Sequence, residues 1–314
     1  MQTKHTIING DSRNMIENQI YCGNCIEVMN KLPVNFVDLT FLDPPFNQQK
    51  EYSLHNDSML EEDYWKMMEE VCHSVFNRTI DGGAIYFMQR EKNTEFVLQT
   101  LRKTGWTFQN LIIWKKRTSA VPVKNKYGKQ YQIIVYATKG SKANTFHRLR
   151  INPVLPANYK FSRENGIYVT DVWDDIKELT SGYFAGTEAI RTNDNQRFHK
   201  QQAPLALLLR IILSSTNPGD IVLDPFSGTG TTVVVAKQIN RKSISIELDP
   251  VNIDCINNRI SIIRDADIIQ KYYEDYICTE NLAEIWGISN NSLNDSNFIE
   301  NNIFNSNIFQ AVVN

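Results

Sequence analysis

The sequence has no apolar run long enough to cross a membrane. A helical span needs about 18 consecutive apolar residues, and no stretch of the 314-residue chain approaches that length. Residues 1–11 are polar and lack the apolar centre of a signal peptide. The expectation is a soluble, cytoplasmic protein with no membrane partner.

Cysteine is scarce, with five residues scattered at positions 22, 25, 72, 255 and 278. Disulfide frameworks are typical of short, cysteine-dense chains, so reduced thiols are expected. Cys22 and Cys25 have the spacing of metal ligands, but no second such pair and no suitably spaced histidines follow. No metal site is expected. The length and the 42% apolar fraction predict one large α/β domain with an inserted or appended module.

Acidic residues are absent from Phe96 to Arg163, although the whole chain has a net charge of −2. This stretch contains 14 lysines and arginines, which gives it a local charge of +14. A solvated surface usually mixes both signs, so the stretch favours contact with a polyanion such as nucleic acid. The residues expected to contact the polyanion are Lys115, Lys116, Arg117, Lys124, Lys126, Lys129, Arg148 and Arg150.

Apolar periodicity predicts alternating strands and helices. Strands are expected at 20–22, 36–42, 84–88, 110–114, 131–137, 221–224 and 243–247, and helices at 26–32, 61–76, 91–104, 204–215, 231–239 and 251–263. Strands 110–114 and 131–137 can pair as a hairpin with a positively charged tip. Residues 141 to about 200 lack clear periodicity and predict an irregular module outside the sheet. Residues 289–314, with nine asparagines, predict a poorly ordered tail.

Two motifs stand where apolar strands are expected to end. Asp43-Pro44-Pro45-Phe46 comes first, and 224–232, with the sequence DPFSGTGTT, follows 181 residues later. Ligands of open α/β sheets bind at the carboxyl ends of the strands. The two motifs are therefore expected to form two halves of one site.

The glycine-rich motif predicts a nucleoside site. Gly228 and Gly230 permit a tight strand-to-helix turn, but no lysine follows as in a P-loop, and a full dinucleotide fingerprint is missing. What remains is a nucleoside cofactor without a pyrophosphate. Glu247, 17 residues past Gly230, has the spacing of an acid that binds ribose hydroxyls. The alternative is a purely structural turn.

The first motif predicts a rigid pair of hydrogen-bond acceptors. Two prolines fix φ and remove two backbone donors, so the Asp43 carboxylate and a neighbouring carbonyl can grip an amino group. Phe46 offers a flat face on which a base can stack. Considered alone, this motif could equally be an ordinary turn.

Together the motifs resemble those of amino-group DNA methyltransferases that use S-adenosylmethionine, which carry (D/N/S)-P-P-(Y/F) and F-x-G-x-G. The order, with the DPPF motif first, resembles the permuted β group. Further similar stretches are 21–25, 172–176, 223–226 and 246–250, and the resemblance runs from about residue 18 to 264.

The resemblance implies a doubly wound Rossmann-like sheet, mostly parallel with one antiparallel hairpin strand, and an inserted target-recognition region. It divides the chain into a catalytic half (1–140), a target-recognition insert (141–197), a cofactor-binding half (198–264) and a C-terminal extension with a partly disordered tail (265–314).

The resemblance also assigns roles to residues. Catalysis is expected from Asp43, Pro44, Pro45 and Phe46. Cofactor binding is expected from Asn24, Cys25, Asp43, His199, Gln202, Asp224, Phe226, Ser227, Gly228, Thr229, Gly230, Thr231, Thr232 and Glu247. Candidates for reading or wedging bases are Arg148, Arg150, Tyr159, Arg163, Tyr183, Phe184, Arg191 and Asn193.

Two departures from the family pattern stand out. The H-P-T-Q-K-P segment of the family reads His199-Lys200-Gln201-Gln202-Ala203-Pro204 here, so Ala203 lacks the usual positive charge. Asn24 replaces the usual aspartate, and it can still hydrogen-bond an adenine amino group without a charge.

The implied activity is site-specific methylation of adenine N6 on a base flipped out of duplex DNA, either within a restriction-modification system or alone. Alternatives are N4-cytosine methylation, a non-catalytic DNA-binding relative, and methylation of structured RNA. Expected partners are double-stranded DNA, a cognate restriction endonuclease and a second copy of the chain.

Overall fold

A computed structural model describes residues 18–47, 58–117, 124–152, 164–179, 186–192, 194–195, 197–198 and 202–288. The tail predicted at 289–314 lies outside these residues. All five cysteines lie within them, and none is in a disulfide. No helix among the described ranges is long and apolar enough to cross a membrane.

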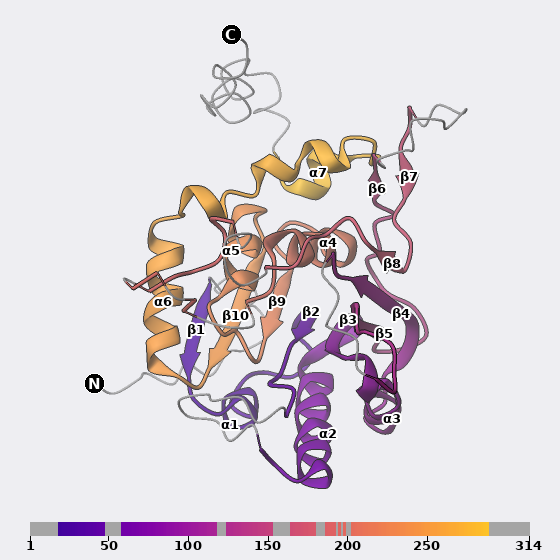
Figure 1. The fold of residues 1–314 in the computed structure, drawn as a ribbon, viewed down its shortest axis with the longest axis vertical. Helices are drawn as coiled ribbons and strands as arrows, with labels where there is room; N and C mark the ends of the chain where they lie inside the picture. Colours follow the sequence, from indigo (N-terminus) through magenta and orange to yellow (C-terminus); the bar gives the residue numbers. More distant parts are fainter. Residues whose placement is uncertain are drawn as a thin grey trace.

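The fold is built on one eight-stranded sheet with the order β1-β10-β9-β2-β3-β5-β4-β8 (Figure 1). Its strands are β1 (Gln19–Cys22), β10 (Lys242–Glu247), β9 (Ile221–Asp224), β2 (Val37–Leu42), β3 (Thr79–Arg90), β5 (Tyr131–Thr138), β4 (Thr107–Lys115) and β8 (Val172–Trp173). Every neighbouring pair is parallel except β3·β5 and β4·β5. The predicted mostly parallel sheet with one antiparallel hairpin strand is therefore confirmed.

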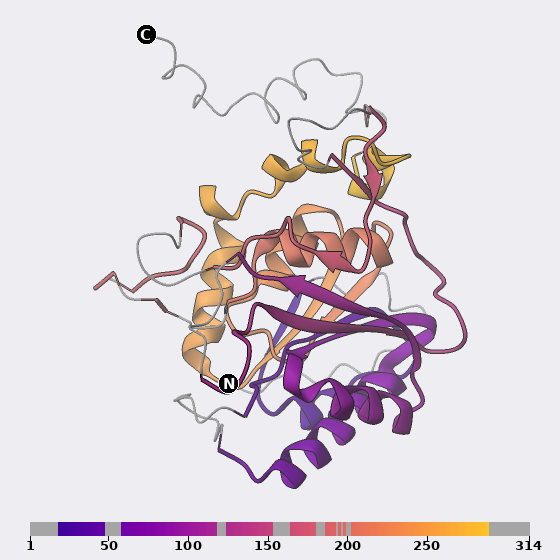
Figure 2. The ribbon, with the colours of Figure 1, turned by 45° about the vertical axis from the view of Figure 1, so that its right-hand side comes forward.

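Helices cover both faces of the sheet, as a doubly wound fold requires (Figure 2). The helices α1 (Cys25–Met29), α2 (Glu61–Arg78) and α3 (Thr94–Lys103) cover one face; α4 (Leu205–Ser215) and α5 (Thr231–Gln238) cover the other; and α6 (Pro250–Ser261) follows β10. All six residues of β2 are buried. A strand enclosed on both faces reads as a continuous apolar run, and this is why its location could be predicted.

Strand β8 corrects one expectation. The stretch 141–200 was expected to lie outside the sheet, but Val172–Trp173 pairs with Ile113–Trp114 of β4 and extends the sheet by one strand. The amide of Ile113 also donates to the carbonyl of Asp171 at 2.7 Å. A strand of two residues is too short to show periodicity, so the sequence pattern could not reveal it.

The C-terminal extension packs on the face covered by α4. It contains three 3₁₀ turns, Asp265–Asp267, Gln270–Tyr272 and Glu274–Tyr276, followed by helix α7 (Leu282–Trp286). Tyr276 and Trp286 are buried in the same cluster as the leucines of α4. A short two-stranded sheet, β6 (Arg150–Ile151) with β7 (Ile167–Tyr168), joins it through a bond from the Arg150 amide to Thr279 Oγ1 at 2.8 Å.

Candidate active site

The two motifs lie at the ends of neighbouring parallel strands. Strand β2 ends just before Asp43, and β9 ends at Asp224. The register between them pairs Thr40 with Leu223, so the chain leaves both strands at the same edge of the sheet. Residues separated by 181 positions are thus brought to neighbouring strand ends, as expected from two motifs that each follow an apolar strand.

The glycine-rich loop depends on Gly230. This residue has φ +77° and stands directly before α5. A Cβ at Gly230 would lie 2.8 Å from the side chain of Ile256 on α6. A larger residue would therefore suffer both backbone strain and a collision, so the close approach of loop and α6 requires glycine.

Glu247 holds the loop from the end of β10. Its Oε2 accepts a hydrogen bond from the Gly228 amide at 2.8 Å. Its Oε1 accepts from the Asp249 amide at 2.9 Å and from the Asn252 side chain at 3.2 Å. A fixed carboxylate beside a glycine turn suits a nucleoside whose ribose hydroxyls donate hydrogen bonds, so the residues present fit the expected cofactor.

Asp224 shapes the loop from within. Its side chain is 3% exposed and accepts from the Phe226 amide at 3.1 Å and from the Thr232 hydroxyl. Burial raises the pKa of this carboxyl to about 7. Ser227, Thr229, Thr231 and Thr232 are buried as well. These contacts give Asp224 a structural role in fixing the turn, which the motif alone did not reveal.

Asn24 caps helix α1. Its Oδ1 accepts from the amides of Ile26 and Glu27 at 2.9 and 3.3 Å. An asparagine directly before a helix is an ordinary N-cap signal, and that reading could have been made from the sequence. The oxygen is engaged in the cap, so the side-chain NH₂ is the group left to donate to a ligand. Next to it, Cys25 is buried, and desolvation raises the pKa of its thiol to about 12.

Gln202 connects the insert to α4. Its Oε1 accepts from the Ile190 amide at 3.0 Å, and its Nε2 donates to the Glu188 carbonyl at 3.2 Å. The Glu188 carboxylate in turn accepts from the Leu205 amide at 2.7 Å, at the start of α4. Burial raises the pKa of Glu188. The side-chain amide of Gln202 thus anchors residues 188–190. His199, the other residue of this segment expected to bind the cofactor, lies outside the described residues.

Phe46 is 4% exposed and belongs to the core cluster that contains Leu39 and Phe41. A ring that stacks on a base needs an accessible face. Because the Phe46 ring is buried in this structure, its stacking on a flipped base stays a prediction.

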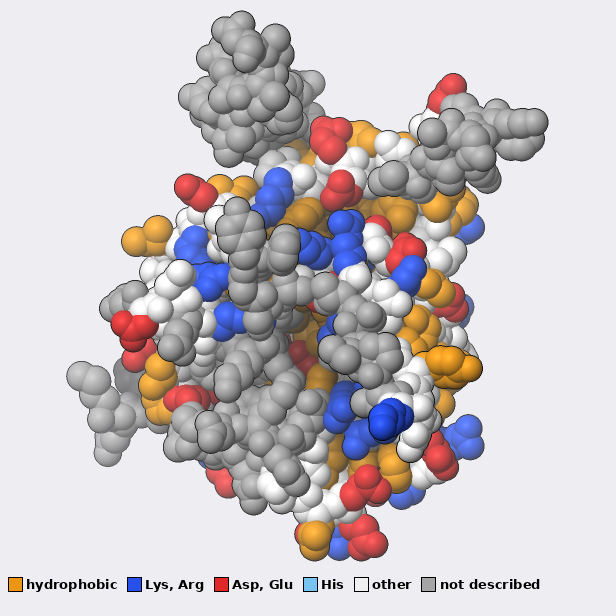
Figure 3. Space-filling view, in the orientation of Figure 1, with side chains coloured by type: hydrophobic (Ala, Val, Ile, Leu, Met, Phe, Trp, Pro, Cys, Tyr) orange, Lys and Arg blue, Asp and Glu red, His pale blue; other side chains and the backbone are white. Residues whose placement is uncertain are grey.

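The hairpin of β4 and β5 carries lysines at the same sheet edge as the motifs. Acids from outside the acid-free stretch pair with two of them: Lys115 lies 3.7 Å from Asp174, and Lys129 lies 2.6 Å from Glu91. Lys124 is exposed, as is Lys126. In the part of the surface that is coloured in Figure 3, Lys and Arg side chains gather on both sides of a central hollow.

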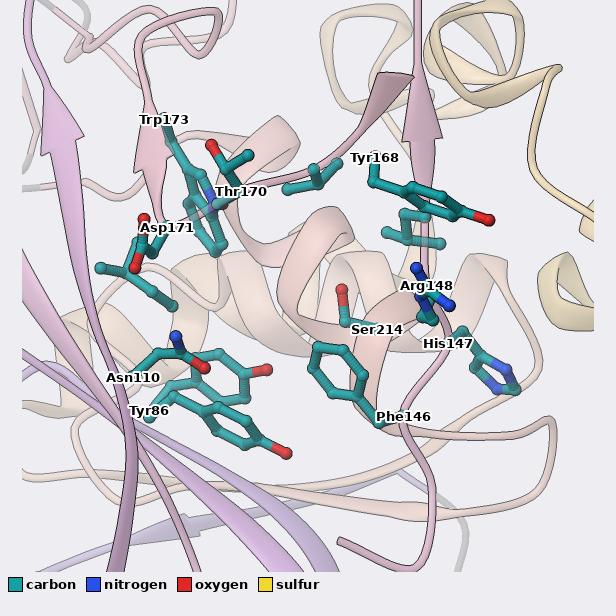
Figure 4. A pocket seen from close by; sticks show the side chains of 14 residues that line it. Tyr86, Asn110, Phe146, His147, Arg148, Tyr168, Thr170, Asp171, Trp173 and Ser214 are labelled. Atoms are coloured by element: carbon teal, nitrogen blue, oxygen red, sulfur yellow. The ribbon is translucent and has the colours of Figure 1, made fainter. Parts of the chain in front are cut away.

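Arg148 and Arg150 lie away from this hairpin tip. Arg148 lines a cavity of about 400 Å³ together with Asn110, near the start of β4, and Ser214, near the end of α4 (Figure 4). Both guanidinium groups lie over the Tyr168 ring, at 4.1 and 4.2 Å from its centroid. The predicted DNA-binding residues therefore form two separate groups, one at the hairpin tip and one around Tyr168.

Most of the residues expected to read or wedge bases lie outside the part of the chain that the structure describes. Tyr159, Arg163, Tyr183, Phe184 and Asn193 lie outside the described residues. Arg191 forms an antiparallel bridge with Arg197 and donates from Nη1 to the Asn195 carbonyl at 2.9 Å.

Residues 37–258 match the model of the N6/N4 methyltransferase family, described as DNA methylase. The chain belongs to this family of DNA methylases. The matched range contains both motifs and the insert between them.

Individual relatives agree. The chain is 33% identical over 249 residues to the DNA adenine methyltransferase YhdJ of Escherichia coli, covering 72% of this chain and 77% of that protein. It is 30% identical over 248 residues to the type II methyltransferase M.HpaI of Haemophilus parainfluenzae, covering 78% and 74%. The structure of an M1.HpyAVI–SAM complex superposes with a TM-score of 0.51 at 23% identity, covering 78% of this chain and 99% of that one. At 23% identity, the similarity to the M1.HpyAVI structure supports the fold alone.

Proposed function

We propose that this DNA methylase transfers a methyl group from S-adenosylmethionine to N6 of an adenine flipped out of duplex DNA. The observation that carries the proposal is the meeting of the Asp43–Phe46 motif and the glycine loop at the ends of β2 and β9. Strand ends at such a switch in chain order are where α/β sheets bind ligands.

The glycine loop and Glu247 hold the cofactor in this proposal. The turn at Gly228 and Gly230 lets the backbone approach a ligand closely. The fixed carboxylate of Glu247 accepts from the ribose hydroxyls, since a carboxylate offers about four lone-pair sites. When bound, S-adenosylmethionine supplies an electrophilic methyl group on a sulfonium.

Asp43 and Pro44 activate the base. An exocyclic amine is a poor nucleophile because its lone pair is delocalised into the ring. Two acceptors, the Asp43 carboxylate and the Pro44 carbonyl, take one N–H each and favour a pyramidal nitrogen whose lone pair is exposed. Such preorganised acceptors lower the barrier by electrostatic placement and orientation. As the new N–C bond forms, the bond between the methyl group and sulfur breaks and leaves a neutral thioether, and the amine releases one proton to the solvent.

The hairpin tip holds the phosphates. The amine of a stacked base cannot be reached inside the duplex, so the base must be flipped out. Lys115, Lys116, Arg117, Lys124, Lys126 and Lys129 are the cations proposed to neutralise phosphates there. A cognate endonuclease and a second copy of this chain remain proposed partners, and so does a role in restriction-modification.

Methylation of cytosine N4 is the second candidate, because the same two acceptors suit either amine. Aspartate at position 43 and the 33% identity to an enzyme named for adenine favour N6. Incubation of the purified protein with duplex DNA and S-adenosylmethionine should yield N6-methyladenine. Digestion of the DNA to nucleosides and mass spectrometry identify the methylated base. N4-methylcytosine in its place would exclude the adenine assignment. Neither product, together with no cofactor binding by calorimetry, would indicate a non-catalytic relative.

A further inference from the structure

Tyr64 of α2 touches the catalytic motif from outside it. Its hydroxyl donates to the carbonyl of Pro45 at 2.8 Å and accepts from Gln89 Nε2 of β3 at 2.9 Å. Tyr64 is 2% exposed and Gln89 is fully buried. Neither residue belongs to the motif, and neither was expected from the sequence to serve the site.

The direction of these bonds follows from the backbone. Gln89 Oε1 accepts from the amide of Arg90 at 2.9 Å, so its NH₂ end must face Tyr64. A tyrosine hydroxyl has one proton. Because Gln89 supplies the donor on one side, the tyrosine proton points to Pro45. The donor chain therefore runs one way, from Gln89 to Tyr64 to Pro45.

Just past the Asp43–Pro44 acceptor pair, ψ of Pro45 is the first backbone angle that proline geometry leaves unrestricted. Proline fixes φ at residues 44 and 45. A residue before proline is held in an extended conformation, which restricts ψ of Asp43 and of Pro44. Pro45 precedes Phe46, so its ψ has no such restriction. That angle sets the direction of the Pro45 carbonyl, the atom that Tyr64 holds.

A second clamp fixes the chain just after the motif. The side chain of Asn47, at φ +51°, donates to the Met59 carbonyl and accepts from the Met59 amide, both at 2.8 Å. Met59 stands just ahead of α2, which carries Tyr64. The motif is thus fixed by its prolines, by Tyr64 at its free angle and by Asn47 behind it.

We infer that Tyr64, supported by Gln89, is a positioning residue that holds the Asp43–Pro44 acceptor pair in its productive geometry. The inference rests on the proposed role of Asp43 and Pro44. Near-attack geometry is sensitive to small displacements, so release of the Pro45 carbonyl should slow methyl transfer without weakening ligand binding.

Tyr64→Phe tests this role, and Tyr86→Phe is its matched control. Tyr86 is also 2% exposed, and its hydroxyl shares a 2.8 Å hydrogen bond with Ser215 rather than with a residue of the motif. In single-turnover assays with saturating DNA and cofactor, Tyr64→Phe should lower the rate about tenfold, the kinetic equivalent of one lost hydrogen bond. Its affinities for S-adenosylmethionine and DNA should change less than twofold. Tyr86→Phe should keep the wild-type rate at a similar loss of thermal stability.

Gln89→Met gives a second test, which also serves if Tyr64→Phe does not fold. Gln89→Met should also lower the single-turnover rate. The Tyr64→Phe/Gln89→Met double variant should be no slower than Tyr64→Phe alone, because both changes disrupt one donor chain. A wild-type rate in both single variants would overturn the inference, and so would an equal loss in Tyr86→Phe. Failure of the proposed function is distinguishable, because the wild-type protein would then transfer no methyl group or would yield N4-methylcytosine.

Discussion

The carboxylate of Glu247 and the backbone amide of Gly228 are joined by a 2.8 Å hydrogen bond between two adjacent strand ends. Glu247 closes β10, and Gly228 lies in the loop that follows β9. One side chain therefore both shapes the glycine loop and presents a fixed acid beside it. The structure links these two residues directly, whereas their sequence spacing only suggested a shared ligand.

Glu247→Ala should weaken cofactor binding by at least about tenfold, because it removes the ribose acceptor and releases the Gly228 amide; a hydrogen bond to a charged group contributes about 1.5–3 kcal/mol. Isothermal calorimetry with S-adenosylmethionine measures the effect. Asp254→Ala removes an exposed acid from α6 and should leave the affinity unchanged. An unchanged affinity in Glu247→Ala would show that this acid does not hold the cofactor.

Asp43→Ala should abolish methyl transfer while leaving DNA and cofactor binding largely intact. The carboxylate is proposed to act on the amine during the reaction, and a loss confined to the transition state lowers the rate rather than the affinities. Radiolabelled methyl incorporation and a DNA mobility-shift assay measure the two properties separately. A variant that still methylates near the wild-type rate would exclude Asp43 as a catalytic residue.

The parts of the fold that could be predicted are those with local patterns. Buried strands such as β2 and amphipathic helices such as α2 show their periodicity directly in the sequence. Strand β8 has two residues and no pattern, and it is specified by its partner β4. Non-local packing, such as Tyr276 against α4, has no signature in a single sequence.

The site shows the same division. Its motifs marked the strand ends correctly, because turn chemistry is local. The contacts of Gln202 with the insert and of Tyr64 with Pro45 could not be predicted, since each joins residues brought together only by the folded sheet.

Asp224→Asn should be more stable than the wild type at pH 8 and should lose that advantage at low pH. Burial raises the pKa of Asp224 to about 7, above the ordinary 3.8, so the folded state disfavours its charged form. The stability that the protonated carboxyl provides is complete below about pH 4 and is lost as pH rises towards 7. Asparagine keeps a similar shape without a charge. Urea unfolding at pH 5 and pH 8 measures the difference, which would be equal at both values if Asp224 did not titrate in this range.

Asp175→Ala should destabilise the protein by about 2–3 kcal/mol, because it leaves the buried Arg210 cation without its carboxylate; the loss is below that of a fully buried pair because Asp175 is 41% exposed. Arg210 of α4 is 2% exposed. It donates from Nη1 to Asp175 Oδ1 at 2.9 Å and from Nη2 to Asp175 Oδ2. The pair therefore joins α4 to the segment that follows β8. Hydrogen bonds from Arg210 lower the pKa of Asp175 against the effect of burial, so the ion pair should stabilise the fold at neutral pH and weaken as pH falls below about 4.

Asp174→Ala is the control for this ion pair. Asp174 is the adjacent acid, but its side chain is 63% exposed and lies 3.7 Å from Lys115, a pair that contributes little. Denaturant unfolding of both variants gives the comparison. Equal losses of stability would show that the bond to Arg210 does not anchor the segment.

Lys124→Ala combined with Lys126→Ala should weaken DNA binding and make it less sensitive to salt. Each phosphate contact removed should lower the slope of log affinity against log salt by about 0.9, so the double variant should lose about 1.8. Fluorescence anisotropy with one duplex at several salt concentrations measures the slope. Arg148→Ala with Arg150→Ala tests the separate group around Tyr168, where both guanidinium groups already lie over the ring. An unchanged slope in the lysine variant would exclude Lys124 and Lys126 as phosphate contacts, because a cation that releases no counterions on binding is not near the DNA backbone.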